Sequence, residues 1–436
     1  MRDFLPADVR KREYVIGIIK EVYESYGFEP LETPAVENLE TLMGKYGEEG
    51  NQLVFKILKR GDKLEQSLDG RDSLADLALR YDLTVPLARV VAHHRNDLPK
   101  FFKRYQIQPV WRADRPARGR FREFYQCDVD AIGSSSMVVE AEQISAVTEI
   151  LTRLGFADFT IRLNHREILA DILDTAGVAS ELQTDALVAI DKLDKIGPEG
   201  VQAELASRGI PDTAAQMLLE IFEQTRQIIE DGKDVNRTIM SNMINIVSPE
   251  VLGDVGRILQ LAAKAPLQLD PSLARGLSYY TGAIFEITVP DLAGSLGGGG
   301  RYDCLIGMFG KEQIPACGFS LGLERILVVM DEREMFPPEI AASAAADVMV
   351  TVWSEETLGE TLKLAAELRR SGIRTTVYPE ADKFGKQMKY ADTIRVPYVC
   401  VFGESEIAAG TVTIKNMRSG EQETIPIKDA ASRLAK

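Results

Sequence analysis

The chain has 436 residues, of which 45% are hydrophobic and 27% charged, a composition typical of a globular protein of two or three domains. The net charge of −15 argues against a general nucleic-acid coat protein, but it does not exclude a local basic patch. The sequence contains no run of about 18 uncharged apolar residues and begins without a signal-peptide pattern, so we expect neither a membrane span nor secretion.

The cysteines bear on the cellular compartment and on metal binding. The four of them lie far apart without a CxxC pair, at Cys127, Cys304, Cys317 and Cys400. This spacing favours free thiols in a reducing cytoplasm and argues against a zinc site. The chain has only three histidines, which leaves few options for histidine-based metal binding or catalytic triads.

The first third of the chain predicts a helix followed by extended segments. Apolar residues recur at helical spacing over 8–26, and Gly27 can end that helix. Residues 28–34 are extended and interrupted by prolines. The aromatic and β-branched residues of 101–111 and 121–132 predict two strands joined by a polar connection.

The middle of the chain changes character twice. A helix over 137–154 and a strand over 159–163 precede a stretch of helix-forming residues at 166–262, which we interpret as a helical insertion. Strand-like sequence returns at 284–289, and we expect a glycine-rich turn at 297–300.

The end of the chain predicts a separate small α/β domain at 347–436, after a linker at 331–346. In that domain we expect strands and helices in alternation over 348–352, 355–370, 374–378, 384–394 and 398–402.

A basic cluster stands out against the acidic total, because residues 100–122 contain eight lysines and arginines and one acid. Charge runs are often solvated loops. Arginine, however, binds phosphate groups with two parallel hydrogen bonds, and repulsion within such a cluster is relieved by a bound anion.

Three further segments carry weaker signals. Residues 274–282 hold an arginine and two tyrosines, which could also be a strand edge. The four glycines of 297–300 form either a flexible turn or a place where the backbone approaches a ligand. Residues 317–325 suit close packing of a strand against a helix. The chain has neither a P-loop nor a correctly placed dinucleotide-binding fingerprint.

The order of these segments resembles class II aminoacyl-tRNA synthetases. Residues 111–114 with 119–130 resemble motif 2 of that class, 318–325 resemble motif 3, and 28–34 resemble motif 1.

Two other segments, Leu79–Pro86 and Arg275–Gly282, are similar to histidyl-tRNA synthetases in particular, and 297–303 also fits that family. Residues 383–392 resemble the anticodon-binding domain that this family shares with some other class II enzymes. The resemblance covers nearly the whole chain.

The resemblance implies an α+β fold with an antiparallel sheet flanked by helices. It places a catalytic domain over 1–330, with the helical insertion inside it, and an anticodon-binding domain over 347–436. Motif 1 builds a dimer interface in this family, which implies a homodimer with twofold symmetry.

The implied reaction joins histidine to ATP as histidyl-adenylate and then transfers the histidyl group to the 3′ end of tRNA(His). Arg112 and Arg275 are the catalytic residues that the resemblance implies. The ATP-binding residues it implies are Arg112, Asp114, Arg115, Arg120, Phe124 and Arg325. The ATP is expected to carry Mg²⁺.

The histidine-binding residues that the resemblance implies are Asp82, Thr84, Gln126, Asp130, Tyr279 and Tyr280. A neutral imidazole offers one donor and one acceptor, so we expect Asp130 to meet one ring nitrogen and Tyr280 the other. Asp82 could instead be a helix N-cap. The chain departs from the family at Ser278, where an acid is usual, and at Asp130, where bacterial members often have Glu.

The expected tRNA contacts are weaker. Lys383, Lys386 and Lys389 recur every three residues and form either a basic helical face or a solvated surface. The main rival function is that of a non-catalytic paralogue that regulates histidine biosynthesis. Such paralogues lack the anticodon-binding domain and tend to lose the catalytic arginine, both of which this sequence retains. Another class II synthetase and a ligase that uses no tRNA are further rivals.

Overall fold

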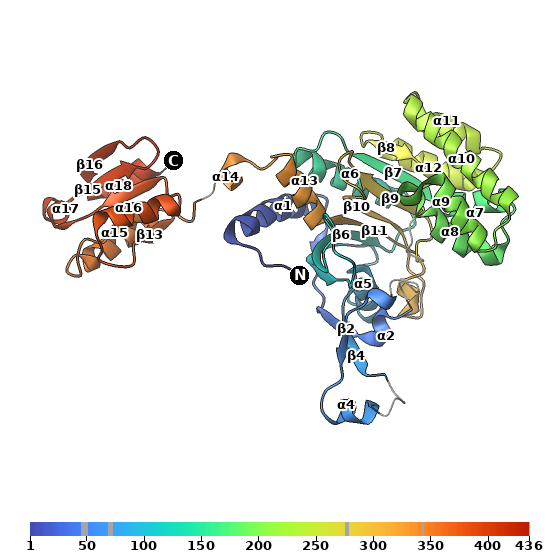
Figure 1. Cartoon of the computed structure of the whole chain (residues 1–436), viewed down its shortest axis with the longest axis horizontal. Coiled ribbons are helices and arrows are strands. Elements are labelled where there is room, and N and C mark those ends of the chain that lie inside the picture. The colour runs from blue at the N-terminus through green and yellow to red at the C-terminus, as the bar shows by residue number, and fades with distance from the viewer. Residues whose placement is uncertain (45–50, 69–72, 275–278, 342–343, 436) are drawn as a thin grey trace. The chain divides into compact units, whose positions relative to one another are not determined.

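The computed structural model describes residues 1–44, 51–68, 73–274, 279–341 and 344–435. These residues divide into two compact units, Met1–Phe336 and Pro337–Lys436. Each unit has its own sheet (Figure 1).

An eight-stranded sheet forms the centre of the first unit, in the order β1-β5-β6-β11-β10-β9-β7-β8. The outermost pairs, β1 with β5 and β7 with β8, are parallel, and the ladders between them are antiparallel. The strands are β1 (Glu29–Pro30), β5 (Phe102–Trp111), β6 (Glu123–Ile132), β7 (Thr160–His165), β8 (Leu267–Leu269), β9 (Ala283–Thr288), β10 (Gly297–Arg301) and β11 (Ala316–Gly322). This arrangement confirms the α+β class and the two long strands expected on either side of the basic connection.

Three helices cover one face of this sheet: α1 (Pro6–Ser25), α6 (Val138–Arg153) and α13 (Leu323–Glu332). Val15, Ile19, Val22 and Tyr23 of α1 are fully buried. The ring of Tyr23 lies 6.0 Å from that of Tyr105. Because side chains alternate across a strand, the odd-numbered residues of β5 and β6 face these helices. The even-numbered residues therefore face the opposite side of the sheet.

A second, three-stranded sheet precedes β5 in the chain. It consists of β2 (Val36–Asn38), β4 (Ala75–Leu79) and β3 (Lys56–Leu58), all antiparallel, with the short helices α2 (Leu39–Leu42) and α4 (Asp62–Ser67) between them. Helix α5 (Thr84–His93) follows β4 after a four-residue connection. The residue pattern does not predict this sheet, because its strands are too short to show a clear alternation.

Helices joined by short turns fill the region between β7 and β8 and gather beside these strands (Figure 1). Their apolar faces pack on one another, as in α10, where Ala215 and Leu218 are buried. The elements are α7 (Arg166–Thr175), the 3₁₀ turn η1 (Ser180–Leu182), α8 (Gln183–Ile190), α9 (Leu193–Ser207), α10 (Asp212–Asp231), α11 (Val235–Met243) and α12 (Pro249–Leu261).

The glycine run is a strand, so the turn expected at 297–300 is wrong. It forms β10, which pairs with β9 on one side and with β11 on the other. A side chain at Gly299 would place its Cβ atom 2.0 Å from the carbonyl oxygen of Gly318. The glycines therefore allow β9, β10 and β11 to approach closely in the middle of the sheet.

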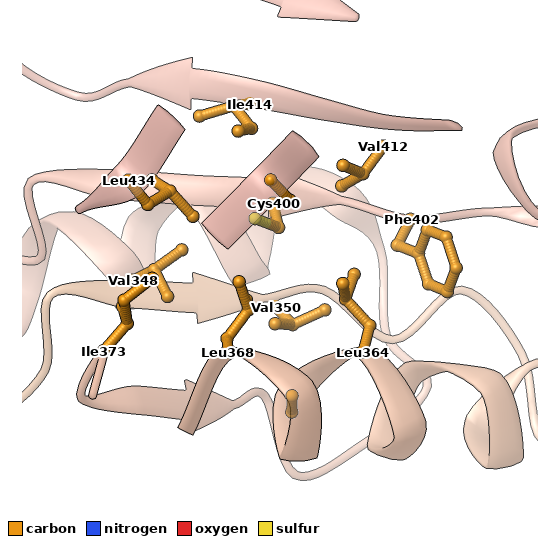
Figure 2. Packing of buried hydrophobic residues seen from close by; sticks show 12 residues of the cluster. Val348, Val350, Leu364, Leu368, Ile373, Cys400, Phe402, Val412, Ile414 and Leu434 are labelled. Carbon is orange, nitrogen blue, oxygen red and sulfur yellow. The ribbon is translucent and has the colours of Figure 1, made fainter. Parts of the chain in front are cut away.

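The second unit contains a five-stranded sheet in the order β13-β12-β14-β15-β16. Its elements are α14 (Pro338–Ala341), β12 (Val348–Val350), α15 (Leu358–Arg370), β13 (Thr375–Val377), α16 (Phe384–Thr393), β14 (Tyr398–Val401), α17 (Glu404–Ala409), β15 (Thr411–Asn416), β16 (Gln422–Pro426) and α18 (Ile427–Leu434). Figure 2 shows Leu364 and Leu368 of α15 facing the buried side chains of β12 and β14. The alternation expected between 348 and 402 is confirmed, and the elements after β14 are additional.

Replacing Gly299 with alanine should test the packing of the glycine strand. We expect Gly299→Ala to lower the free energy of unfolding of the first unit by at least about 2 kcal/mol, because the new Cβ meets backbone atoms that cannot rotate away. Thermal unfolding measures this loss. In the exposed control Gly253→Ala on α12, where no atom lies within 4 Å of the new Cβ, stability should stay level or rise. Equal losses in both variants would contradict the steric explanation.

Candidate active site

Polar side chains gather on the face of the large sheet that lies opposite α1, α6 and α13. The even-numbered residues of β5 and β6 point to this face. Arg104 lies on β5, and Gln126, Asp128 and Asp130 lie on β6. Arg104 stands directly opposite Asp130 in the ladder. All four side chains are buried, which is unusual for such residues, and the Oε1 atom of Gln126, the Oδ1 atom of Asp128 and the Nε atom of Arg104 have no hydrogen-bond partner among the described residues.

Asp130 is held by two groups. Its Oδ2 atom lies 2.8 Å from Nη2 of Arg104, and its Oδ1 atom accepts a hydrogen bond from the Tyr302 hydroxyl group. A Cβ at Gly318, on the adjacent β11, would lie 2.0 Å from Oδ1. The carboxylate therefore occupies space that only a glycine at this position leaves open.

Asp128 shares the same guanidinium. Burial raises its pKa to about 7, Arg104 opposes that rise, and the neighbouring Asp130 adds to it. A hydrogen bond with Ser320 favours the charged form of Asp128. Ser320 also accepts a hydrogen bond of 2.9 Å from the amide of Gln126. Two buried acids and one buried arginine thus meet at this place.

The segment after β4 lies close to this acidic pair. Asp82 caps helix α5, because its Oδ1 atom accepts a 3.0 Å hydrogen bond from the backbone of Val85. This contact supports the alternative of a helix cap, although α5 itself begins only at Thr84. Asp82 also raises the pKa of Asp128 through its charge. Thr84 hydrogen-bonds with Tyr279. Burial and then the charges of Tyr280 and Asp82 raise the pKa of Tyr279 well above its ordinary value.

Tyr280 packs against the preceding tyrosine, and its expected contact with the imidazole stays a prediction. Its ring is buried and lies 5.1 Å from that of Tyr279. The phenol that bonds Asp130 is that of Tyr302, the residue after β10, which sequence reasoning missed. Its position next to the glycine run was the available signal. Arg301 fixes this segment through an ion pair with Glu140 of α6, at 2.6 Å.

Arg112 lies at the end of β5, above two aromatic rings. Its guanidinium carbon is 4.2 Å from the centre of the Tyr81 ring and 5.1 Å from that of Phe124. Its Nε atom donates a hydrogen bond of 3.2 Å to the carbonyl oxygen of Tyr81. The structure thus brings Arg112 and Phe124 together beside the segment that leads to Asp82.

The connection between β5 and β6 contains the other candidates for nucleotide binding. The carboxylate of Asp114 lies 4.0 Å from Nε of Arg120, and both Arg115 and Arg120 are exposed. Gly119 of this connection approaches Arg325, since a Cβ there would lie 3.1 Å from Cγ of the arginine. Arg325 donates a hydrogen bond to the carbonyl oxygen of Ser295.

The basic cluster is not one phosphate-binding surface. Arg104 points into the protein and pairs with Asp130, and Lys103 pairs with Glu142 of α6 at 3.2 Å. Arg118 forms an ion pair with Glu332. Part of the repulsion expected within the cluster is therefore relieved by carboxylates of the protein itself.

Five of the residues singled out in the sequence are not part of this polar cluster. Arg275 and Ser278 lie outside the described residues. Lys383 directly precedes α16 in the second unit, and Lys386 and Lys389 lie within that helix. All three are exposed, and Lys386 pairs with Asp382 at 3.0 Å.

Among the described residues, no cluster of three histidine, cysteine or acidic side chains could hold a metal ion, and all four cysteines are free. No helix in the described ranges is long and apolar enough to cross a membrane.

The chain matches the family model described as Histidyl-tRNA synthetase over residues 1–326 and that described as Anticodon binding domain over residues 347–436. It is 45% identical to a histidine–tRNA ligase from Porphyromonas gingivalis, covering 100% of this chain and 97% of the relative. It is 42% identical to one from Christiangramia forsetii, covering 97% and 95%.

Solved structures agree with these matches. The crystal structure of histidyl-tRNA synthetase from Nostoc sp. PCC 7120 superposes with a TM-score of 0.76 at 30% identity, covering 99% of this chain and 97% of that one. A protein from Bacillus halodurans described as an ATP phosphoribosyltransferase regulatory subunit/histidyl-tRNA synthetase has a TM-score of 0.71 at 20% identity, which shows a shared fold alone. Full-length relatives above 40% identity decide the question, and the chain belongs to the histidyl-tRNA synthetase family.

Proposed function

We propose that this chain is a histidine–tRNA ligase that recognises its amino acid through the carboxylate of Asp130. The observation that carries the proposal is a buried acid held by Arg104 and Tyr302 on the same sheet face as Gln126. A fixed carboxylate is a hydrogen-bond acceptor for an imidazole N–H. Amino acids without a ring donor at that place would leave the buried acid unpaired, which is costly.

The α-amino group of histidine would meet Asp82, Thr84 and Gln126. The charge of Asp82 supports such a role, because it lies close enough to the buried Asp128 to raise its pKa and would attract an ammonium group. Tyr279 and Tyr280 would close the histidine site as a pair of buried rings. In this arrangement the second ring nitrogen of histidine is left to a tyrosine hydroxyl group.

In the first step a carboxylate oxygen of histidine attacks the α-phosphorus of ATP. The bond between that phosphorus and its oxygen bridge to the β-phosphate breaks, so histidyl-adenylate forms and pyrophosphate leaves. Arg112 would hold the α-phosphate, and Arg275 would stabilise the charge that develops there. Positioning and charge stabilisation dominate this kind of step.

In the second step the terminal ribose hydroxyl of the tRNA attacks the histidyl carbonyl carbon, and AMP leaves.

The remaining residues with a proposed role would bind the nucleotide. Phe124 and Arg325 would stack on the adenine, and Asp114 would read its edge. Arg115 and Arg120 would hold the outer phosphates, and their exposure suits a flexible triphosphate. Mg²⁺ would enter with ATP and neutralise phosphate charge, since phosphate oxygens and water are its preferred ligands.

Each of the two units would bind a different macromolecular partner. The basic residues Lys383, Lys386 and Lys389 would contact tRNA(His), and charging would take place in the cytoplasm. A second copy of the chain would dock against the motif 1 segment. A groove of about 670 Å³ there, lined by Leu31, Pro34, Val36 and His93 among others, supports that homodimer.

Amino-acid-dependent exchange of pyrophosphate with ATP tests the proposed substrate. With all twenty amino acids assayed separately, histidine alone should support exchange, because no other side chain is a ring of imidazole size that offers Asp130 a donor and a tyrosine hydroxyl an acceptor. Exchange with a different amino acid, or with none, would refute the assignment.

The Tyr302 hydroxyl should matter for histidine more than for ATP. In Tyr302→Phe we expect KM for histidine to rise about tenfold or more, because Asp130 loses a hydrogen bond that favours its charged form. KM for ATP should stay near the wild-type value. The matched control is Tyr105→Phe, which removes a buried hydroxyl that donates to Glu24 at 2.7 Å on the helix-covered face of β5. A similar rise in that control would contradict a specific role for Tyr302.

The acid pair should also make stability depend on pH. The pKa of Asp128 is raised to about 7, so the folded state holds a proton that the unfolded chain has already lost. Stability therefore falls as the pH rises from about 4 to about 7, and Asp128→Asn should fall less over that window. Thermal midpoints measured from about pH 5 to about pH 8 test this, with Asp76→Asn as an exposed control. Parallel curves for all three proteins would contradict it.

A further inference from the structure

Arg80 is a buried arginine to which neither the resemblance nor the proposed reaction gives a role. It directly follows β4 and is 1% exposed. Its guanidinium donates to the carbonyl oxygen of Thr33 at 2.6 Å, to the side-chain oxygen of Gln108 at 2.8 Å and to the carbonyl oxygen of Pro109 at 2.8 Å. These acceptors are neutral, so the group is held as a rigid link rather than as half of an ion pair.

The link joins three parts of the chain. Thr33 belongs to the extended segment after β1, and Gln108 belongs to β5. The backbone of Arg80 makes the same connections, because its N–H donates to Ala35 at 3.0 Å and its carbonyl accepts from Trp111 at 3.1 Å. Residue 80 is therefore fixed on both sides by main chain and side chain together.

The next residue along the chain contacts Arg112 twice. The Tyr81 carbonyl accepts its Nε–H at 3.2 Å, and the Tyr81 ring lies 4.2 Å from its guanidinium carbon. A shift of the backbone at residue 80 would therefore move both contacts that Tyr81 makes with Arg112 at once. A misplacement of about 1 Å at a reacting group can reduce rates by about a hundredfold.

We propose that Arg80 is a positioning residue for ATP. It anchors the segment after β4 to the motif 1 segment and to β5, and so fixes the Tyr81 carbonyl and ring that orient Arg112. Arg80 acts through Arg112 and does not itself touch the nucleotide. This inference rests on the role proposed for Arg112.

The test measures histidine-dependent pyrophosphate exchange in Arg80→Gln and Arg80→Lys, alone and combined with Arg112→Lys. In the single Arg80→Gln variant, kcat/KM for ATP should fall at least about tenfold, and Arg80→Lys should recover part of the loss. In a protein that already carries Arg112→Lys, adding Arg80→Gln should lower kcat/KM for ATP by less than about threefold. The effects of two substitutions that act through one contact are not additive.

A merely structural role has a different signature. The control Arg162→Gln removes a guanidinium that pairs with Asp270 at 2.8 Å at the other end of the sheet. It should lower the thermal midpoint without changing KM for ATP. If Arg80→Gln behaves like this control, or if its loss is undiminished in the Arg112→Lys background, the inference is wrong.

Two further outcomes are distinguishable. If Arg112→Lys alone leaves exchange unchanged, the role proposed for Arg112 fails, and the inference about Arg80 fails with it. If both Arg80 variants fail to fold, Gln108→Met carries the test, because it removes one acceptor of Arg80 and keeps the side-chain length. That variant should show the same non-additivity with Arg112→Lys, and additive losses would overturn the proposal.

Discussion

The ion pair between Arg104 and Asp130 is the constraint around which the first unit is arranged. Both side chains are almost fully buried, and burying a charge is costly unless it is paired and hydrogen-bonded. The pair can form because β5 and β6 place the two residues opposite each other in the ladder. Gly318 on the next strand leaves room for the carboxylate, and Tyr302 completes its surroundings. The helices on the other face seal the same strands from water.

Two buried arginines have different functions in this account. Arg104 faces two acids, so it sets the charge of the surface on which histidine is proposed to lie. Arg80 is held by neutral carbonyl and amide oxygens, so its contribution is geometric. In the proposed reaction each arginine serves one substrate. Arg104 would fix the acid proposed to meet the imidazole, and Arg80 would fix the backbone that contacts Arg112.

The sequence predicts single helices and strands better than it predicts which strands pair in a sheet. Helical spacing identified α1, and the aromatic and β-branched runs identified β5 and β6. The glycine run was misread as a turn, because glycine usually marks one and only the neighbouring strands reveal the crowding. The three-stranded sheet before α5 was not anticipated.

The candidate site shows the same limit. Arg104 belonged to a basic run that indicated phosphate binding, yet the alternation along β5 turns it toward Asp130. Tyr302 was missed because its contact with Asp130 joins residues 172 positions apart. Asp82 is a helix cap and a neighbour of the acid pair at once, so the two readings of that residue do not exclude each other. The family resemblance supplied the residue roles, but only the register of the strands explains how these side chains are held.

A crystal structure of the chain with histidine and a non-hydrolysable ATP analogue bound would show whether Asp130 binds the imidazole. We expect an imidazole nitrogen within hydrogen-bond distance of the Asp130 carboxylate, with the Arg104 and Tyr302 contacts to that carboxylate kept. A histidine side chain bound elsewhere, or an Asp130 that turns away from it, would refute the proposed recognition.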